Sequence, residues 1–170
     1  MGSPNAPSTT SALQARALRL LAQREHSRAE LRRKLAIHAP PDSPEILERV
    51  LDRLQDTGLQ DEQRSADAVV RRRSSRLGAA RLQSELRGSG LAPDAIAQAL
   101  GNLTATERER ALAVWQKKFG CVPVDARETA RQLRFLLGRG FSAEVARQVV
   151  PRAGGVDTDA DAPPGEAEPG

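Results

Sequence analysis

One short segment of this sequence occurs twice, fifty residues apart. Residues 86–91 read Leu-Arg-Gly-Ser-Gly-Leu, and residues 136–141 read Leu-Leu-Gly-Arg-Gly-Phe. Apolar residues follow the two copies at equal distances, namely Ile96 and Leu100 after the first, and Ala146 and Val150 after the second. Such a period is typical of helical repeat proteins, whose units cannot bury their apolar faces alone and must stack. The repeat therefore predicts a long surface suited to a large partner rather than a pocket for a small substrate.

The remainder of the sequence extends this pattern to nine predicted helices. A third, less similar copy of the repeated pattern lies nearer the start of the chain. It carries Leu31 and Leu35, followed by Leu47 and Leu51 after a longer loop. No segment alternates apolar and polar residues with the period of two that a half-buried strand requires, so we expect no sheet. The predicted fold class is all-α, with three tandem three-helix repeats forming an elongated, curved stack.

The repeats are predicted at residues 11–60, 61–103 and 104–151. Residues 1–10 lack apolar periodicity, and residues 152–170 consist mainly of Gly, Pro, Ala and acidic residues. Neither end can contribute to an apolar core. We therefore expect a disordered N-terminal tail and a disordered, acidic C-terminal tail.

Capping signals predict where two of the helices begin. Ser27 and Glu30 have the spacing of a capping box, in which the hydroxyl accepts from the backbone of the acid and the carboxylate reaches back. Thr104 and Glu107 have the same spacing at the predicted start of the third repeat.

Other residues are assigned to helix ends and faces. Gly78 is expected to interrupt a long helix in the second repeat. The buried face of the eighth helix is predicted at Leu133, Leu136 and Leu137. The glycines of the two repeated turns are expected to allow a positive φ at helix ends and so to set the angle between helices, without contacting anything themselves.

Charge is distributed unevenly along the chain. The net charge is +4, but residues 153–170 contain five acidic and no basic residues, which leaves 26 basic against 17 acidic residues before them. A basic body favours a polyanionic partner or a partner with an acidic face. A compositional bias toward Arg is the alternative explanation.

The basic residues form one cluster in each repeat, near its second helix, and together predict a continuous basic path along the stack. Arg71 to Arg76 span nearly two helical turns, so at least three of the four arginines there are expected to face solvent. The alternative for any one cluster is an ordinary solvated helix face. With few aromatic residues to stack on bases, contacts to nucleic acid are expected at the backbone. The candidate partner-binding or DNA-binding residues are Arg32, Arg33, Arg71, Arg72, Arg73, Arg76, Arg81, Arg131, Arg134 and Arg139.

The sequence offers little for catalysis. His26 and His38 lack companions that would complete a metal site, and Cys121 has no His near it in sequence. The repeated Gly turns lack the preceding strand and the following Lys-Ser/Thr of a phosphate-binding loop. We therefore expect a protein that is not an enzyme and binds no cofactor or metal. Without an apolar leader or a membrane-length segment, a cytoplasmic location with no membrane contact is expected.

Four segments resemble the RecX family of recombinase regulators. Residues 16–35 are similar to the opening segment of the family, and residues 134–141, Arg-Phe-Leu-Leu-Gly-Arg-Gly-Phe, to its characteristic late segment. Arg-Leu-x-x-Glu-Leu at residues 81–86 and Lys-Phe-Gly at residues 118–120 match the middle. The similarity covers roughly residues 12–150.

The resemblance implies a fold of three-helix repeats that lodges along the groove of the RecA recombinase filament. It also implies restraint of ATP hydrolysis, strand exchange and filament growth, in homologous recombination and the SOS response. The middle repeat departs from the family pattern, with Gln63-Arg64-Ser65-Ala66 where an aromatic residue is usual and Arg76-Leu77-Gly78-Ala79 where Gly-Tyr-Gly-Pro is usual. This departure predicts a looser or more continuous helix junction near Gly78.

The expected partners are the RecA filament and single-stranded or duplex DNA, contacted through its backbone by a monomeric protein. The alternative is an autonomous DNA-binding protein of the helix-turn-helix type, because a short turn joins the second and third helices of each set. A structural adaptor that touches no nucleic acid is a further alternative.

Overall fold

The structure, a computed structural model, describes residues 9–153, and all regular secondary structure in this part of the chain is helical. The predictions of disorder for residues 1–8 and 154–170 lie outside the described residues. The helices are α1 (Thr9–Gln23), α2 (Arg28–Ala36), α3 (Pro44–Asp56), α4 (Glu62–Arg73), α5 (Ala79–Gly88), α6 (Pro93–Gly101), α7 (Glu107–Lys118), α8 (Ala126–Gly138) and α9 (Ala143–Val149).

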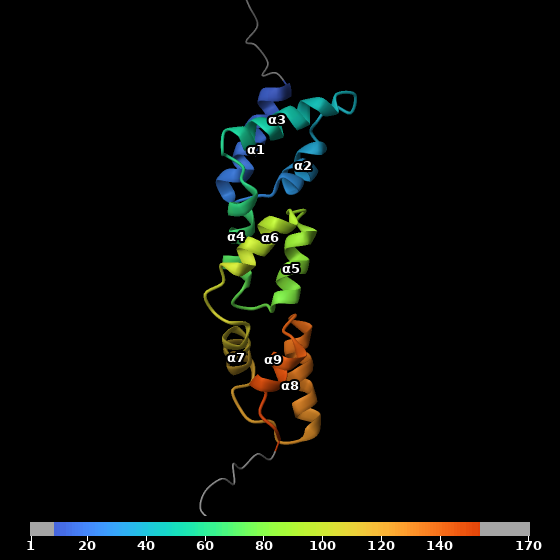
Figure 1. The fold of residues 1–170 in the computed structure, drawn as a ribbon. Coiled ribbons are helices and arrows are strands. Elements are labelled where there is room, and N and C mark those ends of the chain that lie inside the picture. Colours follow the sequence, from blue (N-terminus) through green and yellow to red (C-terminus); the bar gives the residue numbers. More distant parts are fainter. Residues whose placement is uncertain (1–8, 154–170) are drawn as a thin grey trace, which may run out of the picture.

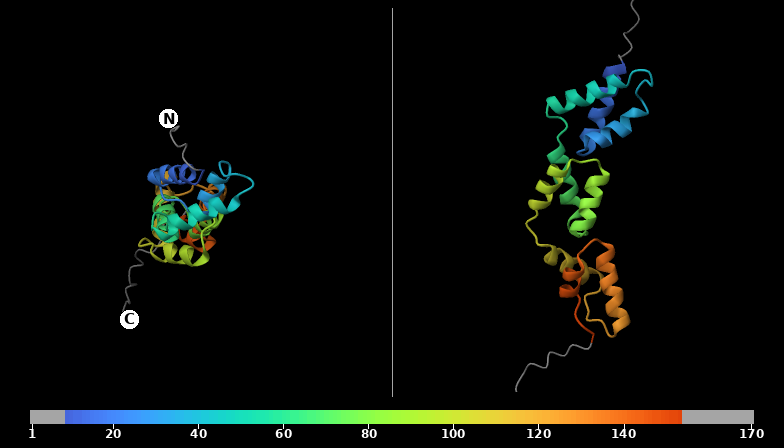
Figure 2. Two further views of the ribbon diagram at one scale, coloured as in Figure 1. Left: turned by 90° about the horizontal axis from the view of Figure 1, so that it is seen from above. Right: turned by 45° about the vertical axis from the view of Figure 1, so that its right-hand side comes forward.

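The helices form three groups of three stacked along one axis. Figure 1 shows α1–α3 at one end, α4–α6 in the middle and α7–α9 at the other end. Viewed along this axis, the molecule has a narrow cross-section (Figure 2). The prediction of an all-α, elongated stack of three-helix repeats is confirmed. We refer to the three groups as repeats one, two and three.

Each repeat has its own apolar core. Leucines from α1, α2 and α3 fill the first core, whereas Ala66, Leu86 and Ile96 lie in the second. The aromatic residues gather in the third core, where Trp115 and Phe141 are buried and Phe119 and Phe135 are partly buried. The extensive helix-to-helix contacts lie within repeats, such as α4 with α6 and α7 with α9. The repeats are therefore joined mainly by helix ends and turns.

Side-chain caps fix the starts of several helices. Ser27 accepts a hydrogen bond from the backbone N–H of Glu30 at 3.1 Å, as predicted, but the Glu30 carboxylate pairs with Arg24 instead of reaching back. The predicted cap at Thr104 is wrong, because α7 begins two residues later than expected. Thr106 and Glu109 form the full capping box there, with the N–H of Thr106 donating to Glu109 at 2.7 Å.

The buried face of α8 is only partly the predicted one. Leu136 is buried and Leu133 partly buried, but Leu137 is 44% exposed, so its assignment to the core is wrong. Gln132, which was not assigned to the core, is fully buried and accepts a 2.7 Å hydrogen bond from Nε1–H of Trp115. The indole N–H needs an acceptor in the core, and a glutamine one turn before Leu136 supplies it.

The segment between α4 and α5 is a defined break. Helix α4 ends at Arg73, and Gly78 is the extended N-cap residue of α5, so the expectation of a more continuous helix is wrong and the chain is interrupted before Gly78. Gly78 is buried, and a Cβ atom built on it would lie 2.2 Å from the carbonyl oxygen of Gly140 in repeat three. Gly78 is therefore a point of close contact between repeats two and three.

Candidate inter-repeat binding face

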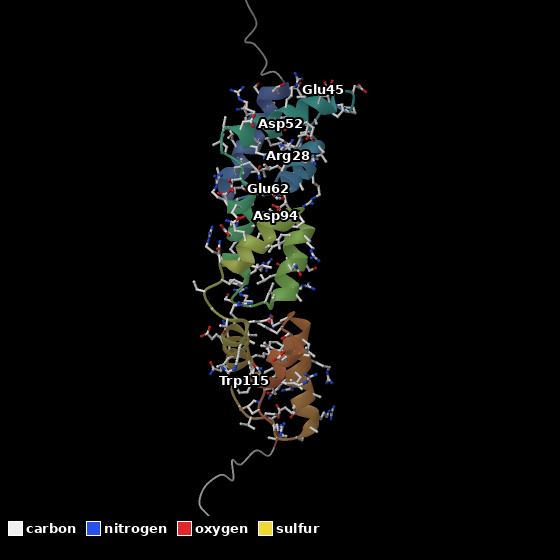
Figure 3. The ribbon with its side chains drawn as sticks, in the orientation of Figure 1. Arg28, Glu45, Asp52, Glu62, Asp94 and Trp115 are labelled. Carbon is white, nitrogen blue, oxygen red and sulfur yellow. The ribbon has the colours of Figure 1, made fainter. Side chains whose placement is uncertain are left out.

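The two junctions between repeats are built by equivalent contacts. At the first junction, the backbone N–H of Arg28, in the first turn of α2, donates to the Glu62 carboxylate at 2.8 Å. At the second, the N–H of Ala79, in the first turn of α5, donates to the Glu107 carboxylate at 2.9 Å. In both cases an acid that opens one repeat caps the second helix of the preceding repeat. Figure 3 shows Arg28 and Glu62 on the two sides of the first junction.

The repeated turns form the other half of each junction. The Ser27 hydroxyl donates to the carbonyl of Ser89, and the N–H of Gly78 donates to the carbonyl of Arg139 at 2.9 Å. The residues that follow these carbonyls, Gly90 and Gly140, have φ values of +72° and +83°. The expected positive φ is thus confirmed at the second glycine of each turn, whereas Gly88 and Gly138 are helical.

The expectation that the glycines of these turns contact nothing is wrong for Gly90 and Gly140, whereas a Cβ atom on Gly88 or Gly138 would meet nothing within 4 Å. A Cβ atom on Gly90 would lie 2.4 Å from Cβ of Ala29, and one on Gly140 would lie 2.5 Å from the backbone nitrogen of Arg81. Gly90 and Gly140 are therefore the places where one repeat packs directly against the preceding one. Only glycine combines the left-handed backbone with this close approach.

A charged cleft of about 400 Å³ opens at the first junction. It lies between the end of α1, the start of α2, and helices α4 and α5. Its charged lining residues are Arg24, Glu30, Arg72, Arg73, Arg76 and Glu85.

Carboxylates neutralise part of this first cleft. Arg24 binds both oxygens of Glu30, at 3.0 and 3.2 Å, and Arg73 lies 3.5 Å from Glu85. Burial disfavours ionisation of Glu30, but the hydrogen bond from Arg24 and its charge outweigh burial and hold the pKa of Glu30 below its ordinary value. Two of the four arginines are therefore already occupied by internal acids.

A second cleft of about 580 Å³ opens at the second junction. Its cationic lining residues are Arg76, Lys117, Lys118 and Arg139, and no acidic side chain lines it. The guanidinium carbon of Arg139 lies 4.4 Å from the ring centroid of Phe135, which also lines the cleft. Nε of Arg139 is buried and has no hydrogen-bond partner within residues 9–153.

The two clefts occupy equivalent positions in the repeat. Counting from the N-cap residues of α4 and α7, which are 45 residues apart, Arg72 and Arg73 correspond to Lys117 and Lys118. With the fifty-residue period of the repeated turns, Glu85 corresponds to Phe135. One of the two acids of the first cleft, Glu85, thus has an aromatic residue as its counterpart in the second. Arg76 lines both clefts, so they adjoin on one side of the stack, which we call the inter-repeat face.

The predicted arginines separate into different environments. Arg72, Arg73, Arg76 and Arg139 lie on the inter-repeat face. All of the arginines at positions 71, 72, 73 and 76 are exposed, as predicted. Arg71 lies in another cleft, with residues of α6 and the α6–α7 connection, and Arg131 and Arg134 line a cleft on α8 that also contains Asp125 and Glu128.

The remaining candidates lie apart from these clefts. Arg32 is bound by both oxygens of Glu48 at 2.7 and 2.8 Å, and this contact raises the pKa of Arg32 and lowers that of Glu48. Arg33 is exposed. Arg81 is exposed, and its Nε lies 4.0 Å from Glu85. The structure therefore brings together four of the ten candidates.

The sequence reasoning missed Arg24, Lys117 and Lys118. The signal that could have found the lysines is a second register, in which Val69-Val-Arg-Arg-Arg73 aligns with Val114-Trp-Gln-Lys-Lys118. The repeated turns at residues 86–91 and 136–141 do not include the first helix of a repeat and so do not give this alignment.

The histidines and the cysteine lie in different environments. Residues 9–153 contain no group of three or more His, Cys, Asp or Glu side chains that could hold a metal ion. Cys121 and His38 are exposed, whereas His26 is buried at the first junction with Nδ1 3.2 Å from Glu30. Within the same residues, no helix has the length and apolar character needed to span a membrane.

The fold defines a protein of stacked three-helix repeats with cationic clefts at its junctions. The family models for the second and third three-helix domains of RecX match residues 61–100 and 106–150. Regulatory protein RecX of Leptothrix cholodnii is 52% identical over 138 residues, which cover 81% of this chain and 87% of that protein. Regulatory protein RecX of Ralstonia nicotianae is 46% identical over 151 residues, covering 89% and 94%. The chain belongs to the RecX family of regulatory proteins.

A solved structure has the same fold. The crystal structure of RecX from Lactobacillus salivarius superposes with a TM-score of 0.69 at 20% sequence identity, covering 85% of this chain and 96% of that one. At this identity the similarity concerns the fold alone. The relatives are named regulatory proteins, and a regulatory role follows for this chain from its family.

Proposed function

We propose that this chain binds the RecA recombinase filament and restrains its ATP hydrolysis, strand exchange and growth in homologous recombination and the SOS response. The observation that carries the proposal is the pair of cationic clefts at successive junctions, joined through Arg76, in a member of the RecX family. A filament repeats its protomers and encloses a DNA strand. A repeat protein can contact neighbouring protomers together, which raises the effective concentration of each contact. In this proposal the protein acts in the cytoplasm as a monomer.

Charge on the third helices of repeats one and two favours the filament regulator over an autonomous helix-turn-helix protein. A recognition helix normally presents basic or amide side chains to the major groove. Helix α6 contains Asp94 and no Lys or Arg, and α3 carries four acids against two arginines. Figure 3 shows Asp94, Glu45 and Asp52 on these two helices. The cations lie instead between repeats, where a stacked partner would meet them.

The test reverses the charge of the inter-repeat face. The triple change Arg72→Glu, Arg73→Glu and Arg76→Glu is expected to abolish inhibition of recombinase ATPase activity, because repulsion replaces attraction over both clefts. Inhibition is measured by titrating each variant into recombinase assembled on single-stranded DNA. Circular dichroism checks that helical content is unchanged.

The matched control reverses three exposed arginines outside both clefts, Arg19, Arg49 and Arg53. This control is expected to inhibit like the unmodified protein. Equal loss in both triples would show that net charge matters rather than the inter-repeat face. Unchanged inhibition by the first triple would refute the assignment of that face.

A further inference from the structure

The lining of the second cleft contains cations but no acid. Its cations are Arg76, Lys117, Lys118 and Arg139, and none of them forms an ion pair within the described part of the chain. The clefts at the first junction, on α8 and beside Arg71 each contain at least one acid. Four adjacent cations repel one another, so a partner rich in carboxylates would be stabilised in the second cleft.

The chain itself contains a segment of matching charge. Residues 154–170, which we call the acidic segment, lie outside the described residues and contain five acids but no Lys or Arg. The acids occur at positions 157, 159, 161, 166 and 168. Their carboxylates can accept hydrogen bonds from ammonium and guanidinium groups. Charge complementarity therefore favours this segment as the occupant of the second cleft.

The acidic segment follows directly on the repeat that forms most of the cleft. Val150 is buried in the apolar core of repeat three together with Trp115 and Phe141. Lys118 lies three residues after Trp115, and Arg139 lies two residues before Phe141. The last described residues therefore belong to the repeat that supplies three of the four cations, and Figure 1 shows the end of α9 beside α7 and α8.

The acidic segment is long enough to reach the cations. An extended chain spans at most about 3.4 Å per residue, so the third acid, eight residues beyond Ala153, reaches up to about 27 Å, and the last acid, fifteen residues beyond, up to about 51 Å. The longest helix of repeat three, α8, has 13 residues and measures about 20 Å. Several of the acids can therefore reach across the whole repeat.

We propose that the acidic segment binds back on the second cleft, with its carboxylates against Arg76, Lys117, Lys118 and Arg139, and so competes with other anionic partners for that cleft. Exposed ion pairs are individually weak. A link of this kind, however, gives an effective concentration on the order of millimolar, so a contact with a dissociation constant in that range occupies the cleft about half of the time. The contact is independent of the proposed function, whereas competition with the recombinase filament rests on it.

The test uses the three lysines of the chain. Lys117 and Lys118 lie in the second cleft, whereas Lys34 is exposed on α2 of repeat one. A water-soluble carbodiimide joins a carboxylate to a lysine amine as an amide, with loss of water, where the two groups meet. Trypsin releases residues 153–170 as one peptide, so mass spectrometry identifies the lysine to which the peptide is joined. Crosslinks to positions 117 and 118 are expected to exceed those to position 34 by about tenfold or more.

Two controls separate binding in the cleft from mere nearness. Arg147→Lys places a further amine at an exposed position of α9, six residues before the last described residue. Crosslinking at position 147 is expected to be weaker than at positions 117 and 118, and an equal or stronger yield there would overturn the proposal. Crosslinks between an isotope-labelled and an unlabelled molecule would place the segment on a second copy and would also overturn it.

Removal of the two arginines tests the cleft itself. Arg76→Gln with Arg139→Gln keeps both lysines and is expected to lower their crosslinking about threefold or more, because half of the cations that hold the segment are lost. Circular dichroism checks the fold, and Arg76→Gln alone, at an exposed position, replaces the pair if helical content falls.

The matched control is Arg127→Gln with Arg134→Gln, which removes two exposed charges from the cleft on α8. It is expected to change the yield less than about twofold, because those charges act only at long range. Equal loss in the two pairs, or an unchanged yield in the first pair, overturns the site.

A full-length variant with a neutral acidic segment tests the competition. It carries Asp157→Asn, Asp159→Asn, Asp161→Asn, Glu166→Gln and Glu168→Gln. Release of a cleft that is half occupied doubles the apparent affinity of a competing partner, so about half as much protein should give equal inhibition of recombinase ATPase activity. Unchanged inhibition, with crosslinks present in the unmodified chain, would overturn the competition and leave the contact. Absence of inhibition by both proteins would instead refute the proposed function, because the crosslinks are measured without recombinase.

Discussion

The two junctions share a framework and differ in charge. Each is built from an acid that caps a preceding helix and from a left-handed glycine packed against the preceding repeat. At the first junction carboxylates neutralise part of the cleft, whereas at the second an aromatic residue replaces the acid and the cations remain unpaired. The comparison teaches that capping side chains and close glycine contacts join the repeats in the same way at both junctions, while other side chains decide the charge of each cleft.

The largest expected effect comes from the glycine contacts. Gly140→Ala is expected to lower the free energy of unfolding by about 3 kcal/mol, because a left-handed backbone is unfavourable for alanine and the new methyl group would overlap the backbone of Arg81. Urea unfolding followed by circular dichroism and by fluorescence of Trp115, the single tryptophan, measures the change.

Gly138→Ala is the matched control for this change. A Cβ atom there meets nothing within 4 Å, and the residue is helical, so we expect a gain of about 0.5 kcal/mol. Similar effects of the two substitutions would contradict the view that the second glycine alone joins the repeats.

The next effect concerns the serine cap at the first junction. Ser27→Ala is expected to cost about 1–2 kcal/mol, because the buried hydroxyl both accepts from Glu30 N–H and donates to Ser89 in repeat two. Ser84→Ala, at an exposed helix position, is expected to change stability by less than about 0.5 kcal/mol. Thermal unfolding of both variants measures the difference, and equal melting temperatures would show that the hydroxyl does not link the repeats.

A smaller effect is expected from the capping acids. Glu62→Gln and Glu107→Gln are each expected to cost about 1 kcal/mol, because each weakens a charge-assisted bond to the N-terminus of a helix in the preceding repeat. Glu45→Gln controls for the helix dipole, since Glu45 lies in the first turn of α3. Chemical denaturation distinguishes the cases, and a cost at position 45 equal to the other two would contradict the junction role.

The smallest expected effect is a pH dependence confined to the first junction. Burial, aided by the charge of Arg24, holds the pKa of His26 below its ordinary value of 6.5. On unfolding, the histidine regains its ordinary affinity for a proton, so the unfolded chain binds more protons than the folded one below about pH 6.5. Stability is therefore complete above this pH and decreases as the pH falls through 6.5 toward the lower pKa of the folded state.

The measurement is the melting temperature between pH 7.5 and 5.5. His26→Asn is expected to flatten this profile, and His38→Asn, at an exposed position, is expected to keep it. A profile that persists in the first variant would assign the effect to another group. Glu30 does not contribute in this window, because its pKa lies below 4.5 and its own stabilisation is lost only at lower pH.

Local patterns were enough to predict most of the helices. Apolar residues at helical spacing placed α3 and α5, and the repeated turn placed the left-handed glycines. The predicted cap at Thr104 failed because two candidate boxes overlap there, and the acid of the wrong one caps a helix in another repeat. Gln132 is polar and was therefore not predicted in the core. Its burial is explained only by the tertiary structure, in which it accepts the hydrogen bond of the Trp115 N–H.

The candidate site was less accessible to sequence reasoning. Arg32 looked like a free cation because its partner Glu48 lies on the next helix, sixteen residues away. Lys117 and Lys118 looked unremarkable alone and gained significance only beside Arg76 and Arg139. Charge patterns along one chain cannot show which cations share a cleft when the cleft forms between repeats.

The sequence by itself determined the repeat, the helices and the basic character of the body, because these depend on residue spacing and composition over short distances. The tertiary structure alone decided which cations are neutralised, which remain unpaired and where the repeats touch. Electrostatic and packing interactions act over a few ångströms in space, and at the junctions residues from two repeats supply the caps and the glycine contacts. The repeated glycines illustrate both, since their spacing predicted the turn and only the stacked repeats revealed what they contact.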